Sequence, residues 1–234
     1  MKKTVRKFWL AGALCAAAAG VGLAAEAPPV LMIGDSMMRL LGIAMEKELA
    51  AAGVRPAVSF SSLASGLARM DAFDWFAKVD ELMREHKPAT VVVTLGANDR
   101  QALKDSTGRV VQFGTPEWEK EYALRVGRIM DDLLKGGAKR VVWLLLPDMR
   151  DPAQQEYAKS VNALFVREMA AETRKDKIVA YDMGPLLSRR PGQFSLYMMA
   201  PNGAALTVRD ADGVHLTNPG AQRVAQAILK KFFK

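Results

Sequence analysis

The feature that most constrains this chain is a series of short, almost wholly apolar runs, each followed by a stretch with helical spacing of apolar residues. Runs such as TVVVTL and RVVWLLL are too short for typical helices and show no polar alternation, which is typical of parallel strands covered on both faces. The expected strands are residues 30–33, 57–60, 90–95, 140–146 and 178–181. Strands that alternate with helices predict an α/β protein with a doubly wound, five-stranded parallel sheet.

The segments between the strands carry helix-end signals. Thr115 and Pro116 predict the start of a helix that runs to residue 134, and Gly136-Gly137 predicts its end. Asn218 is the expected cap of the last helix, with Pro219 at its first position. The other expected helices cover residues 40–52, 71–86 and 153–174.

One segment, residues 194–210, breaks this alternation. Its two short apolar runs flank Asn202-Gly203, a dipeptide that favours hairpin turns. The segment is therefore predicted to be a small hairpin insertion. Its large apolar side chains either form the wall of a substrate pocket or pack in a small core of their own; they are Phe194, Leu196, Tyr197, Met198 and Met199.

Residues 1–27 have the layout of a secretory signal peptide. Four basic residues precede an uncharged stretch over 8–25, and small residues before Pro28 offer a cleavage site. An uncleaved membrane anchor is the alternative, because this stretch is just long enough to span a bilayer. We therefore expect an exported protein, periplasmic or extracellular, with one domain over residues 28–234.

Composition excludes several kinds of chemistry. The single cysteine, Cys15, lies in the N-terminal segment, so the rest of the chain has no disulfide and no cysteine nucleophile. The two histidines, His86 and His215, are too few for a polyhistidine zinc centre, and no metal or other cofactor is expected. Without residues 1–27 the formal charge falls from +8 to +5, and basic residues alternate with acidic ones, so nucleic acid is not expected as a partner.

Ligands of doubly wound sheets lie beyond the carboxyl ends of the strands, so residues that follow strands are the candidates for a site. Ser36 follows the first strand and precedes a helix, whose N-terminus favours developing negative charge. A serine nucleophile needs a base, which His215 can supply. Asp212, three residues earlier, can orient the imidazole as in serine hydrolases. His86 lies in a charged helix end and is expected to be a solvated surface residue.

Two more candidates follow the second and third strands. The Gly66 N–H and the Asn98 amide can donate hydrogen bonds into the space beside Ser36. With the Ser36 N–H they would form an oxyanion hole with three donors. Ser62 or Ser65 is the alternative to Gly66, and each of these short motifs, taken alone, is also common in ordinary turns.

Taken in order, Gly34-Asp35-Ser36, Gly66, Gly96-Ala97-Asn98 and Asp212-x-x-His215 resemble the four sequence blocks of the SGNH (GDSL-type) hydrolase superfamily. The third block is similar to that of a bacterial envelope subgroup catalogued as a domain of unknown function. Met37 stands where the GDSL motif has leucine. The resemblance implies a flavodoxin-like three-layer α/β/α fold. It also implies that Ser36 is the nucleophile, His215 the base and Asp212 its orienter, with Gly66 and Asn98 as oxyanion donors.

The resemblance implies a serine esterase that cleaves a carboxylic ester through an acyl-enzyme and needs no cofactor. An O-acetyl group on an envelope carbohydrate, or an acyl ester of a lipid, is the expected substrate. The first alternative is a periplasmic O-acyltransferase, which would pass the acyl group from a membrane acyl-donor partner to a glycan through the same residues. The second is an inactive glycan-binding module.

Charged residues beside the blocks are the candidates for substrate binding. They are Asp35, Asp99 and Arg100. The alternative for the two aspartates is structural: Asp35 would bond the backbone of its own turn, and Asp99 would hold the loop after the third strand. Arg100 and Arg150 follow the third and fourth strands, where they would either bind an acidic glycan or remain solvated.

Overall fold

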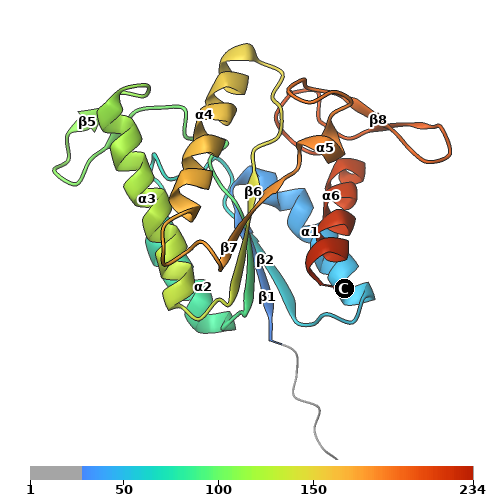
Figure 1. The fold of residues 1–234 in the computed structure, drawn as a ribbon, viewed down its shortest axis with the longest axis horizontal. Helices are drawn as coiled ribbons and strands as arrows, with labels where there is room; N and C mark the ends of the chain where they lie inside the picture. Colours follow the sequence, from blue (N-terminus) through green and yellow to red (C-terminus); the bar gives the residue numbers. More distant parts are fainter. Residues whose placement is uncertain (1–27, 234) are drawn as a thin grey trace, which may run out of the picture.

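The computed structural model describes residues 28–233, and a five-stranded parallel sheet forms its centre (Figure 1). The strands lie in the order β2-β1-β3-β6-β7. Their bounds are β1 (Val30–Gly34), β2 (Ala57–Ser61), β3 (Thr90–Thr94), β6 (Arg140–Leu145) and β7 (Ile178–Asp182). Gly34 pairs with both Ser61 and Thr94, so the carboxyl ends of three strands meet at one edge. The predicted α/β fold with a five-stranded parallel sheet is confirmed.

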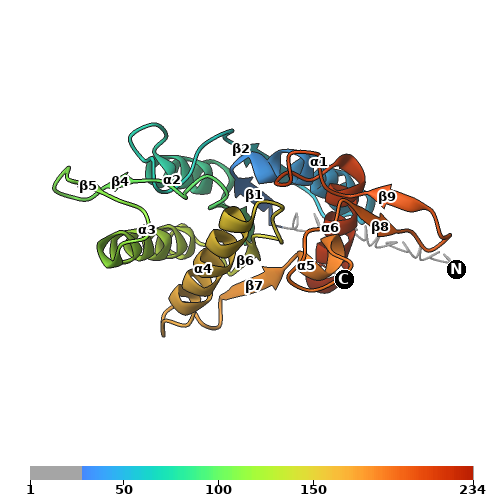
Figure 2. The same cartoon turned by 90° about the horizontal axis from the view of Figure 1, so that it is seen from above.

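Helices cover both faces of this sheet, which gives three layers. Helices α1 and α6 lie on one face, and α2, α3 and α4 lie on the other (Figures 1 and 2). Their bounds are α1 (Ser36–Ala51), α2 (Trp75–His86), α3 (Pro116–Lys135), α4 (Pro152–Met169) and α6 (Asn218–Phe232). The interior strands β1, β3 and β6 are almost wholly buried, whereas the edge strands β2 and β7 are partly exposed. This double burial is the reason why the interior strands are continuous apolar runs.

Each long helix begins with a side chain that accepts a hydrogen bond from its first turn. The capping residues are Asp35, Asp74, Thr115, Asp151 and Thr217. Such a cap contributes about 1 kcal/mol to helix stability. The predicted start of α3 is confirmed, but the predicted cap of α6 is wrong by one position. Thr217 Oγ1, rather than the Asn218 side chain, accepts from the Gly220 N–H. Threonine and asparagine both occur as caps, so residue type alone did not distinguish the two positions.

Other differences from the sequence prediction concern helix ends and very short elements. Helix α1 starts four residues earlier than expected, at Ser36, and α2 starts at Trp75 because Asp74 caps it. Two antiparallel strands, β4 (Leu103–Lys104) and β5 (Val110–Val111), and the short helix α5 (Gly184–Leu187) were not predicted. Elements of two to four residues are too short to show periodicity.

The predicted hairpin insertion is confirmed as an arm that projects beside α6 (Figure 2). Strand β8 (Tyr197–Met199) pairs with the antiparallel β9 (Ala205–Thr207). Gly203 lies in the turn with φ +81°, a left-handed conformation that favours glycine.

The predicted signal peptide or anchor, residues 1–27, lies outside the described residues. Within residues 28–233, no helix has both the length and the apolar character needed to cross a membrane.

Candidate active site

Ser36 lies where β1 ends and α1 begins, at the edge where the strand ends meet. The preceding residues make a very tight connection. A Cβ atom at Gly34 would lie 2.2 Å from the Thr94 carbonyl oxygen of the neighbouring strand, so only glycine fits there. Asp35 then caps α1 by accepting from the Met37 N–H at 2.9 Å. This geometry fixes Ser36 as the first residue of the helix.

Ser36, His215 and Asp212 form a continuous hydrogen-bonded chain. The distance from Ser36 Oγ to His215 Nε2 is 2.7 Å, and the distance from His215 Nδ1 to Asp212 Oδ2 is 2.5 Å. The serine and the histidine are 179 positions apart in the sequence, and the fold brings them into contact. The arrangement has the nucleophile, base and orienter geometry of serine hydrolases.

A tight turn presents the histidine and the aspartate together. Asp212 Oδ1 accepts from the Val214 and His215 N–H groups, and Gly213 has φ +82°. Partial burial opposes ionisation of Asp212. The hydrogen bonds from the His215 side chain and from these two N–H groups outweigh burial and hold the pKa of Asp212 below its ordinary value. The carboxylate is therefore ionised at neutral pH and can stabilise an imidazolium.

The two other predicted oxyanion donors, the Asn98 amide and the Gly66 N–H, follow strands β3 and β2. Asn98 Nδ2 donates to the Ser65 carbonyl oxygen at 2.9 Å, which uses one of its two N–H groups and fixes the direction of the other. Within residues 28–233, the N–H groups of Ser36 and Gly66 have no hydrogen-bond acceptor. The Ser65 hydroxyl is engaged with the Ser62 carbonyl oxygen and with Trp75 Nε1, so it is not a free donor.

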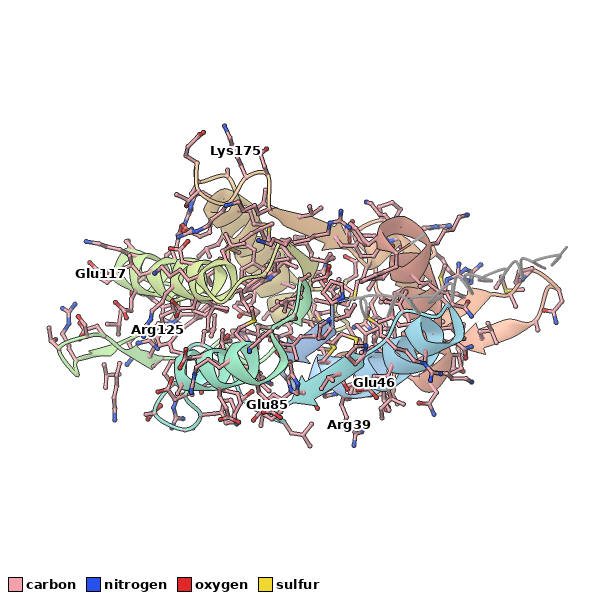
Figure 3. The ribbon with its side chains drawn as sticks, turned by 90° about the horizontal axis from the view of Figure 1, so that it is seen from below. Arg39, Glu46, Glu85, Glu117, Arg125 and Lys175 are labelled. Atoms are coloured by element: carbon pink, nitrogen blue, oxygen red, sulfur yellow. The ribbon has the colours of Figure 1, made fainter. Side chains whose placement is uncertain are left out.

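A cavity of about 440 Å³ lies beside these groups, although Gly66 is buried and is not among the residues that line it. Ser36, Asn98 and His215 line it together with Asp212. The lining also includes Met37, which stands in the first motif. Sequence reasoning missed the rest of the lining, because neither spacing nor motif marks it: Arg39, Leu40, Leu63, Ala64, Asp210 and Leu216. Arg39 projects outward from α1 (Figure 3). A larger cavity of about 830 Å³ lies between α2 and α3, and none of the candidate catalytic residues lines it.

Asp35 does not line the cavity, and its prediction as a substrate-binding residue is wrong. Its side chain has no exposed surface. It links the first and third blocks by accepting from the Met37 N–H and, at 3.1 Å, from the Ala97 N–H. Burial raises the pKa of Asp35 to about 7, although these two hydrogen bonds act in the opposite direction. The structural alternative considered for Asp35 is the one that the geometry supports.

Asp99 is also fully buried, and its prediction as a substrate-binding residue is likewise wrong. Its carboxylate accepts from the Leu67 N–H at 2.9 Å and from the Ala68 N–H at 2.8 Å, and Tyr122 Oη donates to it at 2.8 Å. Burial raises the pKa of Asp99 above its ordinary value. A Cβ atom at Gly66 would lie 2.0 Å from Asp99 Oδ1, so the close approach of this loop requires glycine.

The loop after β2 is held from a second side by Arg125, which the sequence analysis did not single out. Its guanidinium donates to the carbonyl oxygens of Leu67 and Ala68, the residues whose N–H groups bind Asp99. Arg125 extends from α3 and also donates to the Lys104 carbonyl oxygen (Figure 3). The loop that carries Gly66 is therefore fixed through both its donors and its acceptors.

The remaining sequence candidates lie outside the cavity lining. Arg100 is exposed and does not line the cavity. Arg150 binds the turn that carries Asp212 and His215 instead of standing free: its N–H donates to the Gly213 carbonyl oxygen and its Nη1 to that of Ala211. His86 is the last residue of α2, away from the cavity. Among residues 28–233, no three His, Cys, Asp or Glu side chains are grouped as a metal site would require.

The hairpin side chains do not form a wall of this cavity, so that interpretation is wrong. Met198 packs against the main core, whereas Tyr197 and Met199 are exposed. The centre of the Phe194 ring lies 4.7 Å from Cζ of Arg150 and 5.0 Å from Cζ of Arg209. The base of the insertion thus supports the turn that carries His215, and its tip extends away.

The fold, with Ser36, Gly66 and Asn98 following three strands of the sheet and His215 on a later turn, matches the SGNH hydrolase class, as the sequence resemblance predicted. The chain belongs to the family described as protein of unknown function DUF459, whose model matches residues 29–231. No curated protein sequence matches the chain.

Solved structures with this fold include the periplasmic domain of a lipopolysaccharide acetyltransferase from Salmonella ser. Paratyphi A. It is 14% identical to this chain with a TM-score of 0.57, and the match covers 89% of this chain and 85% of that one. A lipase, Lip_vut3, from a goat rumen metagenome is also 14% identical, with a TM-score of 0.49 and coverage of 88% and 98%. At this identity the likeness to the Salmonella domain shows the shared fold.

Proposed function

We propose that this protein is a serine esterase that cleaves a carboxylic ester through an acyl-enzyme. The observation that carries the proposal is the chain of contacts from Ser36 Oγ to His215 Nε2 at 2.7 Å and from His215 Nδ1 to Asp212 Oδ2 at 2.5 Å. A serine hydroxyl in contact with a neutral imidazole, itself oriented by a carboxylate, has a base for its proton.

In the first step, His215 Nε2 takes the proton of Ser36 Oγ as the oxygen attacks the ester carbonyl carbon. The carbonyl oxygen becomes an oxyanion, which accepts hydrogen bonds from the Ser36 N–H, the Gly66 N–H and the Asn98 amide. Each such donor typically contributes about 2.7–4 kcal/mol to transition-state stabilisation. When the tetrahedral intermediate collapses, His215 gives its proton to the leaving alcohol and the acyl group remains on Ser36.

In the second step, a water molecule attacks the acyl-enzyme carbonyl while His215 Nε2 takes one of its protons. The tetrahedral intermediate then collapses, the bond between Ser36 Oγ and the acyl carbon breaks, His215 returns the proton to Ser36 Oγ, and the carboxylic acid is released. The side chains of His215 and Asp212 are 40% and 45% exposed, which gives water a direct path to the base. Water can therefore reach the acyl-enzyme as the acceptor of the acyl group. An O-acyltransferase that uses a glycan hydroxyl in place of water would need the same residues.

The cavity walls support an acyl ester on a larger polar molecule as the substrate. Apolar side chains of Met37, Leu40 and Leu63 line the cavity together with Ser36, and the charged side chains of Arg39 and Asp210 line it as well. An acyl group can contact the apolar residues while a polar alcohol, such as a sugar, contacts the charged ones. We propose an O-acetyl group on an envelope carbohydrate, or a lipid acyl ester, as the natural substrate of an exported enzyme.

The test uses p-nitrophenyl acetate with and without an oligosaccharide acceptor, with Ser36→Ala as the control variant. Hydrolysis predicts free acetate at a rate that the acceptor does not change. Acetylated sugar with little free acetate would favour the acyltransferase instead. A fluorophosphonate probe is expected to label wild-type protein at Ser36, and absence of labelling at neutral pH would support an inactive glycan-binding module.

A further inference from the structure

Arg209 is a buried arginine inside the turn that carries the proposed acid–base pair. It follows β9, is only 1% exposed and forms a bridge with Leu216 across the base of the turn. The Asp210 N–H donates to the His215 carbonyl oxygen at 2.8 Å, which closes the same turn. The chain thus leaves the base of the turn at Arg209 and returns to it at Leu216, and the segment between these residues holds Asp212 and His215.

The guanidinium of Arg209 turns back into this segment and binds its carbonyl oxygens. Nη2 donates to the Val214 carbonyl oxygen at 2.8 Å, and Nη1 donates to the Asp148 carbonyl oxygen at 2.7 Å. Longer contacts reach the carbonyl oxygens of Gly213 at 3.5 Å and His215 at 3.4 Å. A single side chain therefore ties the turn to the connection between β6 and α4.

Burial of the Arg209 guanidinium costs free energy, which is a high cost for a cation with only a structural role on a surface turn. Burial lowers the pKa of Arg209 to about 10, so the guanidinium remains charged at neutral pH. Its hydrogen-bond acceptors in the described part of the chain are main-chain carbonyls and the Met149 sulfur, rather than a carboxylate. A buried charge needs such a set of acceptors, and the planar fork of arginine, with five N–H donors, can reach acceptors that are more widely spread than those around the single ammonium of lysine.

We propose that Arg209 is the positioning residue of the acid–base pair: by fixing the carbonyls of residues 213–215, it holds the His215 ring in line with both Asp212 and Ser36. This inference rests on the proposed function. The turn is exposed on its outer side, so that without Arg209 it is held by Arg150, by the hydrogen bonds of the Asp212 carboxylate within the turn and by the backbone bonds at its base. A small displacement of the ring would lengthen the contact between Nε2 and the serine oxygen.

The test compares Arg209→Met and Arg209→Lys with Arg174→Met. Arg174 is the matched control because its side chain is 12% exposed and binds Asp131 and Glu168, away from the cavity. For p-nitrophenyl acetate, Arg209→Met is expected to lower kcat by about 100-fold with KM close to that of the wild type, the size of effect that a displacement of about 1 Å can have. Arg209→Lys should recover part of this loss, and Arg174→Met should keep the wild-type kcat.

A spectroscopic measurement separates this proposal from the proposed function. The proton between His215 Nδ1 and Asp212 should give a downfield ¹H NMR resonance in the wild type and in Arg174→Met, whether or not an ester is turned over. Arg209→Met is expected to lose or shift this resonance, and Arg209→Lys to shift it, which provides the test if the methionine variant does not fold. A folded Arg209 variant with the wild-type resonance and kcat would overturn the proposal.

Discussion

On one side of the cavity, the loops with Ser36, Gly66 and Asn98 are tied together by two carboxylates, Asp35 and Asp99, that have no exposed surface. On the other side, Asp212 and His215 are nearly half exposed on a turn. Burial raises the pKa of both aspartates on the first side, whereas hydrogen bonds lower the pKa of Asp212 on the second.

This difference matches what the two sides are proposed to do. Hydrogen-bond donors for an oxyanion contribute most when they are fixed before the reaction and do not reorganise. Buried carboxylates that hold main-chain N–H groups provide such rigidity. The base must instead exchange protons with the leaving alcohol and with water, which requires access to solvent. Each side is thus held by charged groups, but only the acid–base side exposes its own carboxylate.

The largest expected effect comes from the contact where the two sides meet. Ser36→Ala and His215→Ala should each lower kcat by about 10⁶-fold, because either change removes the attacking oxygen or the group that accepts its proton. Steady-state hydrolysis of p-nitrophenyl acetate measures this loss, and thermal unfolding should show folded variants. The double variant should lose no more than either single variant. If the loss in kcat of the double variant equalled the product of the two single losses, Ser36 and His215 would act independently, and the proposal that they act together would be wrong.

Asp212→Asn should have the next largest effect, a loss of about 10⁴-fold in kcat. The amide oxygen can still accept from the N–H groups of the turn, so its NH₂ would face His215 Nδ1. The ring would then carry its proton on Nε2, which could not accept the Ser36 proton. Kinetics of Asp212→Asn and Asp212→Ala measure the loss, and full activity in the alanine variant would reduce the triad to a dyad.

A smaller effect is expected on the buried side. Asn98→Ala should lower kcat by about 10²–10³-fold with little change in KM, since the amide is proposed to bind the oxyanion rather than the ground state. Asn162→Ala is the matched control: the Asn162 side chain also binds main-chain groups, the N–H and carbonyl oxygen of Leu146 after β6, but it does not line the cavity. Equal losses in both variants would indicate general destabilisation instead of a role in the reaction.

Much of this comparison could be predicted from the sequence, because a parallel sheet gathers the carboxyl ends of its strands at one edge. The buried runs predicted the sheet, and the residues after the strands included Ser36 and Asn98, which line one cavity. His215, on a loop 179 positions from Ser36, was predicted by its chemistry rather than by strand position.

The direction of a polar side chain could not be predicted in the same way. An aspartate that follows a strand can face the cavity or the backbone of a neighbouring loop, and Asp35 and Asp99 do the second. Arg209 and Arg125 gave no signal either, since arginine is rarely buried and neither lies in a motif. Both depend on carbonyl acceptors that only the folded backbone brings together.

The smallest expected effect concerns the free energy of unfolding, which should depend on pH with opposite sign through the buried Asp35 and the exposed Asp212. An unperturbed Asp35 would have a pKa of 3.8, but burial raises it to about 7 in the folded protein. Between about pH 4 and 7 the folded state therefore keeps a proton that the unfolded state has released. The contribution of Asp35 to stability is complete below this range and is lost as pH rises through it.

Asp35→Asn removes this titration but leaves one of the Met37 and Ala97 N–H groups without an acceptor, at a cost of about 1–3 kcal/mol. Urea unfolding from pH 4 to 8 should show the variant's deficit largest at pH 4 and shrinking as pH rises. For Asp212, whose pKa is lowered from 3.8 in the folded protein, the contribution is present above that value and lost as pH falls below it, so the deficit of Asp212→Asn should be constant from pH 4 to 8 and shrink only when the series is extended to more acidic pH. Deficits with the same sign of slope would mean that the two carboxylates share one environment, and the division of the site into a buried and an exposed side would fail.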